Sequence, residues 1–208
     1  MQATSTNARI AAAIVALVAW TGLGVQFAAT YAGSGSVAET LWIVLRYFTV
    51  ITNLAVALLL TAVAIGLRVG PHLLTGVTLA ILLVGVVYGL LLRGLVELSG
   101  GALLADALLH KVVPVLTPLF WLVFAPKGHV RSRDPLLWAL YPLGYFGYAL
   151  VRGQVEGRYA YPFIDVAALG RPATLLNALL IALGFLAAGY AILWLDRRLA
   201  QNAMQTGV

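Results

Sequence analysis

The sequence predicts an all-α, polytopic membrane protein built as one bundle of six transmembrane helices, and three observations lead to this fold class. Of the 208 residues, 62% are hydrophobic and only 10% are charged, which is too few charges to cover a water-soluble domain. The apolar residues form six long runs, each close to the roughly 20 helical residues that cross a bilayer. Clusters of Gly, Pro and Ser separate the runs, as expected for turns between helices. We therefore expect a single transmembrane domain over residues 1–208.

The expected spans follow one another along the whole chain: they cover residues 9–30, 41–65, 72–93, 103–124, 135–152 and 174–196. The first run has no clear cleavage site, so we expect a retained span and not a removed signal peptide. The fifth span is the shortest and contains Pro142, which leaves its limits the least defined. The loop at 153–173 carries aromatic residues that are typical of a membrane interface.

Basic residues near the span ends predict the orientation. On the side of the two termini lie Arg9, Arg68, Lys127, Arg131, Arg133, Arg197 and Arg198. On the opposite side lie Arg93, Arg152, Arg158 and Arg171. Because cytoplasmic loops carry the excess of Lys and Arg, we expect both termini in the cytoplasm.

Composition also excludes several kinds of site. The chain has no cysteine, so disulfides, thiolate metal sites and a cysteine nucleophile are excluded. With one embedded histidine and no HExxH motif, we expect no metal and no cofactor. The net charge of +6 lies mainly at span ends, where it fits lipid headgroups better than nucleic acid. Membrane lipids are therefore the expected partners, with neither nucleic acid nor an obligate protein partner.

Two polar segments interrupt these apolar spans, at residues 46–53 and 106–111. An ionisable group near the centre of a membrane helix costs about 2.5–3.5 kcal/mol, so groups kept there usually bind, carry protons or do chemistry. Counted from the outer ends of their spans at about 1.5 Å per residue, Thr49 and His110 reach a similar depth. We therefore expect the two polar segments to form one site.

The first polar segment is expected to present one helical face. Trp42, Arg46, Thr49 and Asn53 are spaced as i, i+4, i+7 and i+11, which stacks them on one side of a continuous helix. Thr52 lies off this face and is the weaker candidate. An isolated membrane threonine usually bonds its own helix, so the shared face is what favours Thr49.

The second polar segment has the spacing of a base and its orienting carboxylate. Asp106 and His110 are an i, i+4 pair, so the carboxylate can reach one ring nitrogen and raise the basicity of the other. Pro114 cannot donate to the carbonyl of His110, which predicts a weakened, kinked helix there. The structural alternative is that His110 only ties spans together through a hydrogen bond to Asn53 or Tyr88.

Three short motifs carry a resemblance to a known family. They are RYFTVITNL at residues 46–54, His110 followed by Val113 and Pro114, and YPF at residues 161–163. In order and spacing they resemble the androgen-induced-gene-1-like proteins, a six-helix family that includes the androgen-dependent tissue-factor-pathway-inhibitor-regulating protein.

This resemblance implies a membrane-embedded threonine hydrolase of fatty acid esters of hydroxy fatty acids, with Thr49 as nucleophile and His110 as base. In the animal members an amide stands in the place of Asp106 and a small polar residue in that of Lys111. The resemblance therefore assigns no role to these two side chains.

The leading hypothesis is a lipid ester hydrolase that works in the outer half of the bilayer, with Thr49, His110 and Asp106 as the catalytic residues. Five residues are expected to bind the substrate: Arg46, Asn53, Lys111, Tyr88 and Tyr161. Among them, Arg46 or Lys111 would pair with a substrate carboxylate, and Asn53 would donate to the oxyanion. Two alternatives stay open: an anion or proton-coupled transporter or lipid-binding protein that uses the same charges, and a small scaffold for another membrane protein.

Overall fold

The computed structural model describes residues 5–206, and their side chains up to Asn202. All regular structure in this part of the chain is helical and none of it is strand, which confirms the predicted all-α class. The chain divides into two compact units, Met1–Pro126 and Lys127–Val208, and each is described by itself. The single transmembrane domain stays a prediction.

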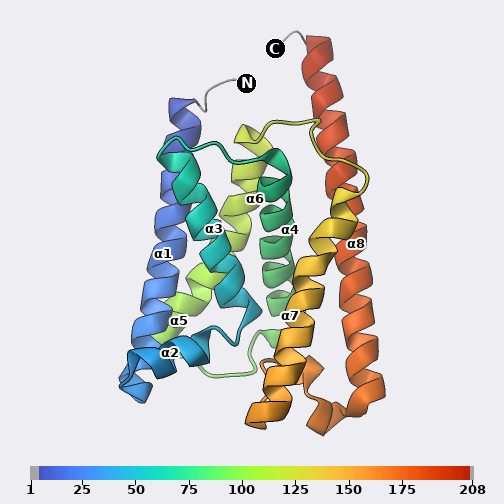
Figure 1. Ribbon diagram of the computed structural model, residues 1–208. Coiled ribbons are helices and arrows are strands. Elements are labelled where there is room, and N and C mark those ends of the chain that lie inside the picture. Colours follow the sequence, from blue (N-terminus) through green and yellow to red (C-terminus); the bar gives the residue numbers. More distant parts are fainter. Residues whose placement is uncertain (1–4, 207–208) are drawn as a thin grey trace. The chain divides into compact units, whose positions relative to one another are not determined.

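The first unit is an up-and-down bundle (Figure 1). Its long elements are α1 (Thr6–Ser34), α3 (Phe48–Ala64), α4 (Pro71–Val87), α5 (Gly100–Ala107) and α6 (Val113–Phe124). Helix α1 packs against α3, α5 and α6, and α4 packs against α3 and α6. Alternating chain direction between neighbours follows from the short connections, as in other helical bundles.

Local chemistry explains where these helices begin and end. Ser5 caps α1, because its hydroxyl accepts the N–H of Ala8 at 3.2 Å. Gly35 ends α1 in the left-handed conformation at φ 68°, which a residue without a Cβ adopts at little cost. Pro71 opens α4 at a position where no backbone donor is needed. Arg9 Nε donates to the carbonyl of Ala64 at 3.0 Å and so joins the start of α1 to the end of α3.

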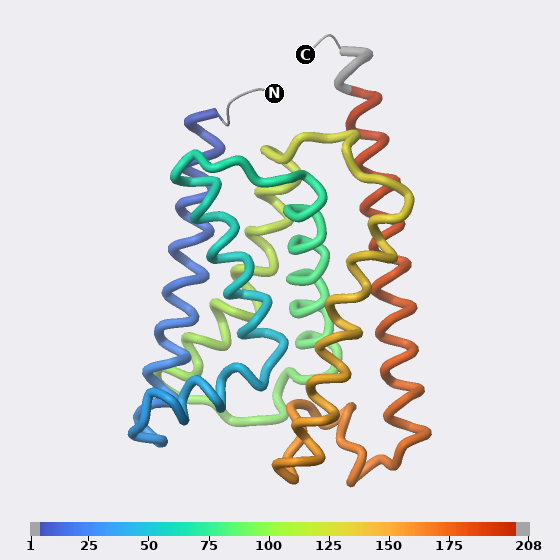
Figure 2. The backbone as a smooth tube through the Cα atoms, viewed as in Figure 1, coloured from blue at the N-terminus to red at the C-terminus, as the bar shows by residue number. Residues whose placement is uncertain are grey.

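The chain does not form the continuous helix expected over the span at 41–65. The chain there forms two helices, α2 (Val37–Val44) and α3, bent by 100° relative to each other (Figure 2). The last turn of α2 closes through tight i→i−3 bonds, from Arg46 N to Ile43 O and from Tyr47 N to Val44 O. Tyr47 then adopts an extended conformation and α3 restarts behind it. The break contains neither Gly nor Pro, so the usual turn signals are missing from the sequence.

Two helices of the first unit widen into π turns. One, η1 (Tyr88–Leu92), ends α4, and the other, η2 (Leu108–Val112), joins α5 to α6. The second lies just before Pro114, so the weak point that the missing N–H predicted takes the form of a π turn. Single π turns in α-helices are frequently found at functional sites.

The second unit is a helical hairpin of α7 (Asp134–Glu156) and α8 (Val166–Thr206), which pack side by side (Figure 1). A short 3₁₀ turn, η3 (Pro162–Ile164), lies in the connection between them. Gly170 interrupts the first turns of α8 with non-helical angles, so the straight part of this helix starts beyond it. Asn177 Nδ2 donates to the carbonyl of Phe163 at 3.0 Å and anchors the connection.

Several helices are able to cross a membrane, as expected of a multi-pass membrane protein. Within the described part of the chain, four are long and apolar enough, and the bent pair α2–α3 makes a fifth if it counts as one span. Helix α7 covers the expected fifth span but is not among them. The six-span count and the cytoplasmic termini therefore stay predictions.

Candidate functional site

The site is centred on η2, which is packed by neighbours of the first unit. Helices α1, α3 and α4 all contact this π turn. Two glycines allow the close approach: a Cβ on Gly22 of α1 would lie 2.7 Å from Leu109 Cδ2, and one on Gly85 of α4 would lie 2.9 Å from Pro114 Cβ. Gly22 therefore lets α1 lie close to η2, and Gly85 lets α4 lie close to the start of α6, directly after η2.

The structure brings the two polar segments together. Thr49 Oγ1 lies 3.2 Å from His110 Nε2, although the two residues are 61 positions apart in the sequence. Thr49 is the second residue of α3 and is 6% exposed. The His110 side chain is 21% exposed, so the pair is buried on the threonine side and accessible on the histidine side.

Asp106 lies at the other nitrogen of the imidazole. Its Oδ1 is 3.1 Å from His110 Nδ1, and the carboxylate is 7% exposed. The distance is that of a hydrogen bond, but Nδ1 has no well-aligned acceptor within the described residues, so a small ring rotation is needed to complete the bond. With its proton on Nδ1, the imidazole leaves Nε2 free to accept the proton of the Thr49 hydroxyl.

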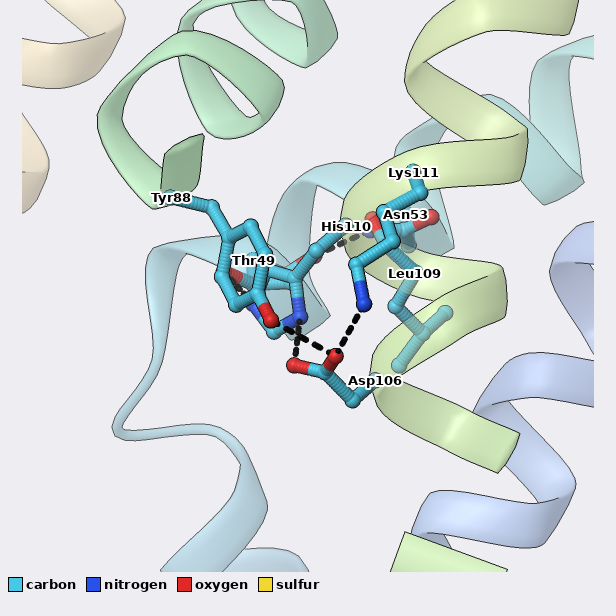
Figure 3. A network of polar contacts seen from close by, with 7 residues as sticks. All are labelled: Thr49, Asn53, Tyr88, Asp106, Leu109, His110 and Lys111. Atoms are coloured by element: carbon cyan, nitrogen blue, oxygen red, sulfur yellow. Dashed lines mark hydrogen bonds and ion pairs between the residues drawn. The ribbon is translucent and has the colours of Figure 1, made fainter. Parts of the chain in front are cut away.

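Two further side chains meet the second carboxylate oxygen (Figure 3). The Tyr88 hydroxyl donates to Asp106 Oδ2 at 2.7 Å, and Lys111 Nζ donates to the same atom at 3.0 Å. The Tyr88 ring also stacks on the His110 ring, with centroids 4.3 Å apart and planes inclined by 18°. The two π turns thus contribute the residues around the carboxylate, η1 with Tyr88 and η2 with His110 and Lys111.

Asn53 has a structural position in this site. Its Nδ2 donates to the carbonyl of Thr49 at 2.8 Å and to the carbonyl of Leu109 at 3.1 Å, and the residue is fully buried. One amide therefore ties the start of α3 to η2 and helps to set the distance between Thr49 and His110. Both N–H groups of Asn53 are used in this way, so donation to an oxyanion would require one of these bonds to break.

The expected face of Trp42, Arg46, Thr49 and Asn53 is wrong, because the chain breaks between α2 and α3. Trp42 lies on α2 and is 58% exposed, whereas Arg46 lies in the break and is 7% exposed. Tyr161 belongs to the second unit, where its ring stacks on Phe163 at 5.2 Å. Its part in substrate binding stays a prediction, as does that of Arg46.

The arrangement provides a hydroxyl, a base and a carboxylate in series, with a positive end of a helix beside the hydroxyl. Thr49 lies in the first turn of α3, where the positive end of the helix dipole favours negative charge. Among the described residues, no group of three His, Cys, Asp or Glu could hold a metal ion. The sequence did not predict the helix break or the stacking of Tyr88 on His110, since neither has a local signal.

Comparison with known proteins found no relative from which a function could be inferred. No family model matches the chain, and neither the curated proteins nor the solved structures gave a match. The functional argument therefore depends on the geometry of Thr49, His110 and Asp106.

Proposed function

We propose that the protein is an intramembrane lipid ester hydrolase in which Thr49 is the nucleophile and His110 the general base. The observation that carries the proposal is the 3.2 Å separation of Thr49 Oγ1 and His110 Nε2, with Asp106 at the other ring nitrogen. A nucleophile, a base and a group that orients the base, each within hydrogen-bond reach of the next, is the arrangement that activates a hydroxyl.

The reaction follows from these contacts in two steps. His110 Nε2 takes the Thr49 proton while Oγ1 attacks the ester carbonyl, and the collapse of the tetrahedral intermediate returns that proton to the leaving alcohol. An acyl-threonine remains. His110 then takes a proton from water, the hydroxide attacks the acyl carbon, and the carboxylic acid leaves as Oγ1 regains its proton.

The N-terminal turn of α3 is the best-placed source of oxyanion stabilisation. The break between α2 and α3 puts a helix start directly at the nucleophile, as Thr49 is its second residue. The positive end of the helix dipole then acts on the charge that develops on the ester oxygen. This assignment replaces Asn53, whose amide already binds two carbonyls.

The proposal includes a lipid substrate and a membrane topology. The resemblance to the androgen-induced-gene-1-like proteins favours fatty acid esters of hydroxy fatty acids. Helix α7, 23 residues long, would be the fifth span along the chain and would bring the total to six. With six spans, the distribution of Lys and Arg favours two cytoplasmic termini. The family that the chain resembles has many bacterial members, which favours a bacterial inner (plasma) membrane.

The test compares two threonines of α3. Thr49→Ala should abolish hydrolysis of a panel of lipid esters in detergent, because no hydroxyl remains beside His110. Thr52→Ala is the matched control, since Thr52 is also buried on α3, at 1% exposed, but is not the threonine bonded to His110. Hydrolysis by Thr49→Ala at the wild-type rate would eliminate Thr49 as the nucleophile.

A second candidate function is transport of an anion or of protons by the same polar cluster. The broken helix α2–α3 favours it, because transporters often form their binding sites from discontinuous membrane helices. A phosphonate probe for reactive hydroxyls separates the two functions. Labelling that requires Thr49 supports the hydrolase, whereas ligand uptake into vesicles without labelling supports transport.

A further inference from the structure

Tyr88 contacts both partners of the proposed base at once. Its hydroxyl donates to Asp106 Oδ2 at 2.7 Å, and its ring lies against the His110 ring with a centroid distance of 4.3 Å. Figure 3 shows the phenol across the imidazole with its oxygen directed to the carboxylate. A side chain that only filled space between α4 and η2 would not need this hydroxyl, and Phe would serve equally well.

The geometry points to Tyr88 as a positioning residue for His110, and not as a substrate-binding residue. This inference rests on the proposed function and deepens it, because it assigns how the base is held. The phenol ring restricts rotation of the imidazole, and the phenol hydroxyl fixes the carboxylate that faces Nδ1. One rigid side chain from η1 therefore sets the orientation of both members of the pair.

The need for such a residue follows from the path of the proton. The imidazole must keep Nε2 toward Thr49 while it receives a proton and again while it releases one. Asp106 alone does not align it fully, since the Nδ1–Oδ1 approach of 3.1 Å lacks the direction of a good hydrogen bond. A stacked ring on one face of the imidazole supplies the missing restraint without adding a charge.

The position of Tyr88 also explains which oxygen of the Asp106 carboxylate faces His110. Oδ2 accepts from Tyr88 and from Lys111, so Oδ1 is the oxygen left for His110. Lys111 Nζ lies 5.3 Å from the centre of the Tyr88 ring, which adds a cation–π contact to the same arrangement. The Tyr88 hydroxyl is therefore already used in holding the carboxylate.

The experiment separates positioning from substrate binding through kcat and KM of ester hydrolysis. Tyr88→Phe keeps the stacked ring and should lower kcat about tenfold, the effect of one hydrogen bond to a charged group. Tyr88→Leu removes ring and hydroxyl and should lower kcat about a hundredfold, the effect of a misplaced catalytic group. KM should stay within about twofold in both. Tyr31→Phe, a tyrosine of α1 stacked on Phe27, is the control and should leave both constants unchanged.

A second measurement does not need hydrolysis. The chain has three histidines, so the ring protons of His110 can be assigned in a histidine-labelled sample by comparison with a His110→Gln variant. Stacking on Tyr88 should shift these protons upfield in the wild type and in Tyr88→Phe, and the shift should disappear in Tyr88→Leu.

Each outcome decides one point. A raised KM with unchanged kcat in Tyr88→Phe would show that Tyr88 binds substrate and would overturn the inference. Ring protons of His110 that are identical in the wild type and in Tyr88→Leu would overturn it too. A wild-type protein that cleaves no ester would overturn the proposed function alone, because the ring shift still reports whether Tyr88 holds His110.

Discussion

Two buried carboxylates, Asp106 in the first unit and Asp196 in the second, differ in their hydrogen-bond partners, although a lysine charge acts on each of them, Lys111 on Asp106 and Lys127 on Asp196. Asp196 is fully buried on α8, and its Oδ2 accepts the backbone N–H groups of Gly128 at 2.9 Å and Val130 at 3.2 Å. Asp106 is 6% exposed and contacts only the side chains of Tyr88, His110 and Lys111 in the bonds described above. Both residues would look the same in a hydropathy profile, as a charge in an apolar helix.

The partners explain what each carboxylate does. Backbone N–H groups cannot change protonation state or leave their loop, so Asp196 fixes the segment before α7 to α8. The side chains that contact Asp106 include a histidine, which can accept a proton, so Asp106 is placed to act on the proposed base. The cost of a buried charge is therefore a weak sign of function by itself, and the identity of its partners is the stronger sign.

The largest expected difference is in kcat, when each of the two carboxylates is replaced by its amide. Asp106→Asn removes the charge that orients His110 and should lower kcat of ester hydrolysis by about 10³- to 10⁴-fold. Asp196→Asn should leave kcat unchanged, because one amide oxygen can still accept the two N–H groups that Oδ2 accepts. Steady-state kinetics on a lipid ester measures both. Equal losses of kcat in Asp106→Asn and Asp196→Asn would show that the two carboxylates do not differ in their effect on hydrolysis.

The sequence predicted much of the site because helical spacing is a local property. Asp106 and His110 belong to one continuous run, and the i, i+4 rule places them together even though that run contains a π turn. The agreement in depth between Thr49 and His110 likewise predicted one site, and their side chains are in contact.

The parts that could not be predicted depend on contacts between distant segments. The chain turns at 45–47 without Gly or Pro, so packing in the tertiary structure, and not turn chemistry, breaks the helix. A continuous helix would place Trp42 and Arg46 on one face with Thr49, and the break separates both residues from the helix of Thr49. Tyr88 is among the residues expected at the site, but nothing near it in the sequence indicates that its ring stacks on the imidazole of His110.

A smaller effect, on stability, is expected when Asp196 is shortened. Asp196→Ala leaves the buried N–H group of Val130 and the part-buried N–H group of Gly128 without their acceptor, which should lower the free energy of unfolding by about 1–3 kcal/mol. The midpoint of thermal unfolding in detergent should fall while kcat of the remaining folded protein stays the same. Asp196→Asn is the control and should lose less stability. A fall in kcat at low temperature, with the fold intact, would contradict a structural role.

The smallest effect is expected at Lys111, the partner of Asp106 that is most open to its surroundings. Its side chain is 50% exposed, and exposed ion pairs contribute only about 0.2–1 kcal/mol. Tyr88 also remains on the same carboxylate oxygen, so Lys111→Met should lower kcat less than about fivefold, as such an energy implies. The loss should be equal for an ester with a free carboxylate and for its methylated form, and Lys111→Arg should restore activity on both. A loss confined to the carboxylate-bearing ester would instead make Lys111 the anchor for substrate charge, as the sequence led us to expect.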